Sequence, residues 1–146
     1  MPSPREAEVA AEWALIERFG CLPGWTRRAL RTKFARVDFF ASDVMGKRED
    51  GSMVWAQVTK AKSTANVRPR RRKLERVPWS NLDLVLLLHM RTDDSTRPHR
   101  HHFRVHRLVA TLPEQPGIWT VDDELMDIPR AWFKVWAPTQ DTGDER

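Results

Sequence analysis

The densest set of chemically active side chains is basic and lies between residues 68 and 76. Glu75 is the only acidic residue among them. A run of this kind forms a solvated charged face or binds the phosphates of nucleic acid. Its density favours phosphate contact. The basic residues of this run are Arg68, Arg70, Arg71, Arg72, Lys73 and Arg76. A second basic set would extend the same surface and consists of Arg27, Arg28, Arg31, Lys33 and Arg36.

A second group combines histidine and arginine over residues 97–107. It consists of His99, His101, His102 and His106 with Arg97, Arg100, Arg104 and Arg107. Two histidines two positions apart on a strand share a face and can chelate a metal. No acidic or cysteine partner stands close by in the sequence, so a basic hairpin facing nucleic acid or solvent is favoured. Cys21 is the only cysteine, which excludes an internal disulfide, and it lacks the neighbours of a nucleophile.

Asp43 and Gln57 stand at the ends of two apolar runs that flank a turn. Residues 37–43 are apolar on both faces, which predicts a strand covered on both sides. Asp50-Gly51 predicts a hairpin turn, and residues 53–59 predict the partner strand. If both strands are straight, we expect Asp43 to oppose Met53 or Val54. It would reach Gln57 only if the first strand bends.

The remaining elements predict a mixed α/β fold around one sheet. Apolar spacing predicts a helix over 5–19 that ends at Gly20, while 25–34 fits either a strand or a short helix. Further expected elements are a helix over 67–77, strands over 82–90 and 103–109, and a short helix or extended segment over 129–136. Trp13, Trp55 and Trp79 are expected in the core. Trp132, Phe133 and Trp136 are expected to pack over the sheet edge rather than form an exposed patch.

Composition indicates one soluble domain. The chain has 146 residues, of which 40% are hydrophobic and 31% charged, with a net charge of +5 that suits a polyanionic partner. We expect a frayed start over 1–4, one domain over 5–138 and a polar tail over 139–146. The longest apolar run, residues 84–88, is too short for a membrane span, and residues 1–10 lack a signal-peptide core. A cytoplasmic location is therefore expected.

The stretch SDVMGKREDGSMVWAQVTK, which ends at Lys60, resembles the core of the PD-(D/E)-x-K nuclease superfamily. In that core an Asp adjoins a strand, a hairpin turns, and the next strand carries an acidic residue or Gln, one spacer and a Lys. The wider order is also similar to that of Holliday-junction-resolvase-like members, many of them from phages and archaea. The resemblance covers about residues 6–109. It implies a restriction-endonuclease-like fold and a metal-dependent DNA endonuclease.

The resemblance also implies roles for single residues. The metal-binding Asp falls on Asp43, and the second ligand position falls on Gln57, a neutral oxygen ligand. The main-chain carbonyl of Val58 would be a further ligand. The acidic residue of the first helix falls on either Glu8 or Glu12. The expected cofactor is Mg²⁺ or Mn²⁺, held by oxygen ligands that leave water in its shell.

The family's Lys position falls on Thr59, which is a departure from the pattern. Lys60 is the next residue and points to the other face of a regular strand, unless a bulge at 57–60 re-aims it. Lys62, in the following loop, is the other candidate. A Lys at this position would stabilise the transition state or help to deprotonate water.

Two further functions remain open beside the endonuclease. One is a catalytically inactive nuclease-fold protein that binds nucleic acid or serves in an assembly. The other is a small structural subunit that docks through its Trp-rich C-terminal segment. Resolvase-like members act as dimers, so a homodimer is expected, and a virus-encoded protein would work in the host cytoplasm.

Overall fold

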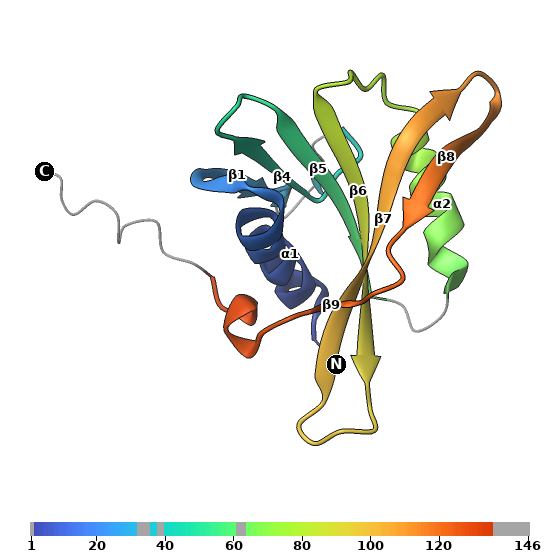
Figure 1. The fold of residues 1–146 in the computed structure, drawn as a ribbon. Coiled ribbons are helices and arrows are strands. Elements are labelled where there is room, and N and C mark those ends of the chain that lie inside the picture. Colours follow the sequence, from blue (N-terminus) through green and yellow to red (C-terminus); the bar gives the residue numbers. More distant parts are fainter. Residues whose placement is uncertain (1, 32–35, 38–39, 61–63, 136–146) are drawn as a thin grey trace, which may run out of the picture.

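The computed structural model describes residues 2–31, 36–37, 40–60 and 64–135. Lys33, Lys62, Trp136 and the tail expected over 139–146 lie outside these residues. The fold is mixed α/β, with one seven-stranded sheet and two α-helices that cover opposite faces (Figure 1). None of the helices within the described residues is long and apolar enough to span a membrane.

Helix α1 spans Pro4–Phe19 and confirms the helix predicted over 5–19. Ser3 caps it: its Oγ accepts from the Glu6 N–H at 3.1 Å, and the Ser3 N–H donates to Glu6 Oε1 at 2.9 Å. This capping box orders residues that were expected to fray. Gly20 ends the helix at φ 77°, a left-handed conformation that favours glycine.

The sheet begins with three antiparallel strands, which a helical crossover connects to the remaining strands. Strand β1 spans Cys21–Arg28, β4 Val44–Arg48 and β5 Met53–Thr59, and they pair antiparallel in the order β1-β4-β5. The chain then passes through a 3-10 turn (η1, Thr64–Asn66) and helix α2 (Val67–Glu75). Strand β6, Asp83–Asp93, returns parallel to β5, and this is the one parallel pair among the described strands of the sheet.

The C-terminal part completes the sheet. Strand β7 spans Arg100–Leu112 and β8 Gln115–Val121, and both neighbours pair with β7 antiparallel. The short β9, Met126–Asp127, also pairs with β7, and a 3-10 turn (η2, Arg130–Phe133) follows. Trp132 of this turn is buried in the apolar cluster that also includes residues of α1 and of the sheet, which agrees with the prediction that it packs on the sheet. The sequence predicted neither β8 nor β9.

The strand predicted over 37–43 is wrong over 40–43, whereas Val37 ends a short strand and residues 38–39 lie outside the described residues. Two short strands, β2 (Leu30–Arg31) and β3 (Arg36–Val37), pair with each other outside the main sheet. Phe40 and Ala41 have φ of 48° and 64°, which no regular strand contains. Phe40 and Ala41 therefore lie in a turn, and the strand of the main sheet begins only at Val44.

The two faces of the sheet bury different material. The face under α1 packs the small side chains of the helix, such as Ala10 and Ala14, against Val54, Leu86 and Phe103. The face under α2 contains a smaller apolar cluster of Trp55, Val67, Leu74, Val85 and Leu87. Buried polar side chains stand beside this smaller cluster, and their strand positions decide where a functional site can form.

Candidate functional site

Asp43 lies beside Gln57 because of the hairpin register. Val44 pairs with Ala56 and Lys47 with Met53, so continuing this register by one residue brings Asp43, which lies at a bend before β4, opposite Gln57. The expectation that Asp43 opposes Met53 or Val54 is therefore wrong. Asp43 directly precedes β4 rather than ending an earlier strand, and the register of this hairpin places the end of β5 opposite it.

Asp43 is held by the main chain on two sides. Its N–H donates to Ala56 O at 2.8 Å, and its carbonyl accepts the Ala29 N–H at 2.7 Å. The side chain is 1% exposed, and its Oδ2 accepts the Val58 N–H at 2.8 Å. Charge-assisted bonds of this kind fix a carboxylate rigidly and lower the cost of burying it. The carboxylate thus stands at the end of β5 with a set orientation.

Gln57 is equally buried and engaged at both ends of its amide. Its Nε2 donates to the Ala41 carbonyl, in the turn before Asp43. Its Oε1 accepts from Arg70 Nη1 at 2.5 Å, so helix α2 supplies a cation to this position. The sequence grouped Arg70 with the phosphate-binding residues and did not reveal this contact, because it joins α2 to a strand in the preceding hairpin.

The structure separates the candidates for the Lys position. Thr59 is buried and shares the α2 face with Gln57, because the two lie two residues apart on β5. The β5–β6 register runs without a shift from Met53–Asp83 to Thr59–His89, so the stretch through Thr59 contains no bulge that would re-aim Lys60. Lys60 follows the end of β5 and is half-buried. Among the contacts of the described residues, the cation that reaches Gln57 is the guanidinium of Arg70.

Of the two helix glutamates, Glu12 has a defined link to this end of the sheet. Its Oε1 lies 2.9 Å from Arg28 Nε, and Arg28 pairs with Val44, the neighbour of Asp43. Burial raises the pKa of Glu12 to about 7, against the lowering effect of Arg28 and Arg27. Glu8 is also buried, one helical turn earlier. The carboxyl of Glu12 therefore exchanges a proton near neutral pH.

The basic residues of α2 divide into an outer and an inner set. Arg68, Arg72, Lys73 and Arg76 are exposed, as the sequence predicted for a phosphate-binding surface. Arg70 and Arg71 instead turn toward the sheet: Arg71 Nη2 lies 2.6 Å from His106 Nδ1, and its guanidinium stacks over Trp119. In the second basic set, Arg27 is exposed, whereas Arg28 is bound to Glu12.

One histidine of β7, His102, has an acidic partner that the sequence did not reveal. His102 Nδ1 lies 2.8 Å from Asp127 Oδ1, and Arg100 contacts the same carboxylate at 3.1 Å. The expectation that no acidic side chain is nearby is wrong, because β9 returns to pair with β7. Within the described residues, no cluster of three or more His, Cys, Asp or Glu side chains is placed to hold a metal ion.

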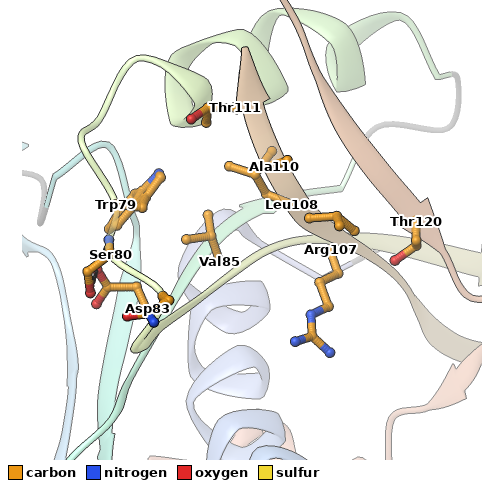
Figure 2. Close-up of a pocket in the computed structure, with 11 residues that line it drawn as sticks. Trp79, Ser80, Asp83, Val85, Arg107, Leu108, Ala110, Thr111 and Thr120 are labelled. Carbon is orange, nitrogen blue, oxygen red and sulfur yellow. Dashed lines mark hydrogen bonds between the residues drawn. The ribbon is translucent and has the colours of Figure 1, made fainter.

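A pocket of about 510 Å³ lies at the opposite end of β5 and β6. Figure 2 shows Ser80 and Asp83 on one side of it and Arg107 and Thr120 on the other. Asp83 has a structural role, because its carboxylate oxygens accept hydrogen bonds from Trp55 Nε1 and from the Ser80 N–H, each at 2.9 Å. Asp83 pairs with Met53, so this pocket is a full strand length from Thr59.

Comparison of the chain with known protein families, with curated proteins and with solved structures finds no match. Any function is therefore inferred from the residues and their geometry.

Proposed function

We propose that the chain is a metal-dependent DNA endonuclease related to the PD-(D/E)-x-K nucleases, with its active centre at Asp43 and Gln57. The observation that carries the proposal is the concentration of buried polar side chains where β4 begins and β5 ends. Asp43 and Gln57 are each 1% exposed, and Ser42 and Thr59 are buried beside them. Burying polar groups costs stability, so such a concentration indicates a site built for chemistry rather than for packing.

The order of elements supports the same proposal. An acidic helix, a strand, a hairpin, a basic helix and two more strands follow one another, which is the order of the resolvase-like nucleases that the sequence resembles. The parallel β5–β6 pair places the end of β5, at Thr59, beside His89 of β6, and β6 continues from there to Asp93. Ligand sites in open α/β sheets lie outside the carboxyl ends of parallel strands.

The donor set fits a hard cation of low affinity. Asp43 offers a carboxylate, Gln57 an amide oxygen and Val58 a main-chain carbonyl, all of which are oxygen ligands. One negative charge binds a divalent cation weakly, and Arg70 now occupies the Gln57 oxygen. When bound, Mg²⁺ or Mn²⁺ would supply Lewis-acid activation of the scissile phosphate.

The chain's own residues would perform the remaining steps. Arg70 would turn from Gln57 to a phosphate oxygen, and the exposed basic residues of α2 would hold the flanking backbone. Glu12, with a pKa of about 7, can accept or return a proton at neutral pH. Lys60 would provide a further positive charge at the end of β5.

Cleavage of labelled DNA tests the proposal. A four-way junction and a linear duplex of the same sequence are incubated with Mn²⁺, and the substrate that is cut distinguishes a resolvase from another endonuclease. Asp43→Asn should reduce cleavage by about a hundredfold or more, while it keeps an oxygen acceptor for the Val58 N–H. The matched control is Asp122→Asn, an exposed carboxylate after β8, which should cut at the normal rate. Cleavage unaffected by Asp43→Asn would refute the proposal.

A second function, DNA binding without cleavage, is favoured by one contact. The Arg70 guanidinium on Gln57 Oε1 satisfies the amide within the protein and makes a bound cation unnecessary. Binding of either DNA with no cleavage at any Mn²⁺ concentration would establish this function. The homodimer expected from the resemblance is tested on the same sample by light scattering.

A further inference from the structure

A second polar pocket lies on the α2 side of the sheet, two strands away from β5. It has a volume of about 530 Å³ and is bounded by α2 on one side and by β7 and β8 on the other, elements that lie next to each other in Figure 1. Its charged lining consists of Arg68, Arg71, Arg72, Arg104, Glu75 and Asp123. Four positive and two negative side chains leave an excess of two positive charges.

One of the two acidic side chains in the wall, Glu75, already accepts a hydrogen bond within the protein. Glu75 Oε2 accepts the indole N–H of Trp119 at 2.7 Å, and this bond ties α2 to β8. Arg71 stacks on the same indole, with its guanidinium carbon 5.1 Å from the ring centroid. Glu75 therefore acts as a fixed part of the wall, and Arg71 is held in a set orientation by Trp119.

The contact between Arg71 and His106 determines where the imidazole proton lies. A guanidinium can only donate, so His106 Nδ1, 2.6 Å from Arg71 Nη2, must accept. The proton of the neutral ring is then on Nε2. Burial and the nearby Arg71 lower the pKa of His106 to about 4, so the ring is neutral at pH 7.

Three N–H groups of this wall have no acceptor among the residues that the structure describes. They are Nε2 of His106, which is 5% exposed as a residue, and Nε of Arg71 and of Arg104. In the described part of the chain, each of these atoms is buried and makes no hydrogen bond. An unsatisfied buried donor costs about 1–3 kcal/mol. All three donors belong to residues that line the pocket, so a ligand rich in oxygen could accept from each of them.

We propose that this pocket binds a phosphate group carrying two negative charges, either as inorganic phosphate or as the terminal phosphate of a nucleic-acid strand. The excess of two positive charges matches the charge of such a group at neutral pH. Its several unesterified oxygens can accept from all three unsatisfied donors, and planar guanidinium groups pair with phosphate in two-bond geometry. An internal phosphodiester has one negative charge and fits less well. The pocket does not include Asp43 or Gln57, so the inference stands without nuclease activity.

Binding of short oligonucleotides without metal tests the inference separately from cleavage. Two fluorescent single strands of the same sequence, one with a 5′ phosphate and one with a 5′ hydroxyl, are titrated with Asp43→Asn protein in EDTA. We expect the phosphorylated strand to bind about tenfold more tightly. Arg104→Gln should remove this preference, and Arg107→Gln, an exposed arginine of the same strand, should keep it.

Inorganic phosphate provides a measurement on the unaltered protein. Added phosphate should shift the ¹⁵N resonance of His106 Nε2 and should compete with the phosphorylated strand. A shift of this resonance with no preference between the two strands would identify free phosphate as the ligand. No shift and no preference would overturn the inference, whether or not Arg104→Gln folds.

Discussion

The two faces of the central sheet are built on opposite principles. Under α1 the buried strand residues are almost all apolar, and the helix contributes small side chains that allow close packing. Under α2 the same three strands, β5, β6 and β7, bury Gln57, Thr59, His89 and His106. Alternation along a strand makes this possible, because every second residue belongs to the other face. The α1 face of the strands thus stabilises the fold, and their α2 face has the strand residues that can bind and react, while Glu12 joins the proposed centre from α1 itself.

The largest expected effect concerns the apolar face. Phe103 on β7 is fully buried against α1, so Phe103→Ala should lower the free energy of unfolding by about 3–5 kcal/mol. Urea denaturation measures this loss. Val109→Ala, an exposed position on the same strand, is the control and should change it by less than about 0.5 kcal/mol. Equal losses at both positions would remove the distinction between a packed and an open region of β7.

The next prediction concerns how the polar face holds its helix. Arg70→Met leaves the buried Gln57 oxygen without this donor and should cost about 1–3 kcal/mol. Gln57→Leu combined with Arg70→Met should cost less than the sum of the two single changes, because the unsatisfied amide is gone. Strict additivity in urea denaturation would mean that the Arg70–Gln57 bond does not stabilise the fold.

The two faces should also differ in the sign of their pH dependence. The pKa of His106 falls to about 4 from 6.5, so the unfolded chain binds the proton first and the contribution of His106 is lost as pH falls from 6.5 toward 4. The pKa of Glu12 rises from 4.5 to about 7, so its contribution is complete below 4.5 and is lost as pH rises toward 7. Unfolding of His106→Gln and Glu12→Gln, compared with wild type across pH 4–7.5, should show opposite slopes.

The smallest expected effect separates the outer surfaces of the two helices. Arg72→Gln on α2 should weaken DNA binding a few-fold and reduce the salt dependence of log K by about 0.9 if it contacts one phosphate. Arg18→Gln, an exposed arginine in the last turn of α1, should leave both unchanged. Equal effects would indicate that DNA binds by net charge rather than on the α2 face.

Regular elements with local signals were predictable from the sequence. Helix α1 had apolar spacing and a glycine stop, and β5 was predicted with its bounds, because a strand buried on both faces leaves an uninterrupted apolar run. The strand over 37–43 failed because an apolar run also occurs in a turn that packs against the sheet: Phe40 contacts Trp55 and Ala41 joins the α2-side cluster.

The geometry of the candidate site depended on contacts that one-dimensional patterns do not encode. Asp43 and Gln57 were identified as neighbours by resemblance, but their pairing required the hairpin register, which shifted once β4 began at Val44. The contacts of Arg70 with Gln57 and of Arg71 with His106 join segments 13 and 35 residues apart. Strand β8 was missed because Pro116 and Gly117 interrupt its apolar pattern, although it forms an edge where proline is tolerated.

The close approach of β1 to β4 has a practical consequence for labelling. A Cβ on Gly46 would lie 2.6 Å from Cys21 Sγ, so the glycine lets the thiol sit tightly against the strand, where burial raises its pKa to about 11. Because it is buried and its pKa is raised, we expect the only thiol of the chain to react slowly with maleimides in the folded state. One cysteine introduced by Arg72→Cys on α2, or by Arg18→Cys on α1, would then be the single site modified. A dye at each position would report which face of the native protein meets DNA.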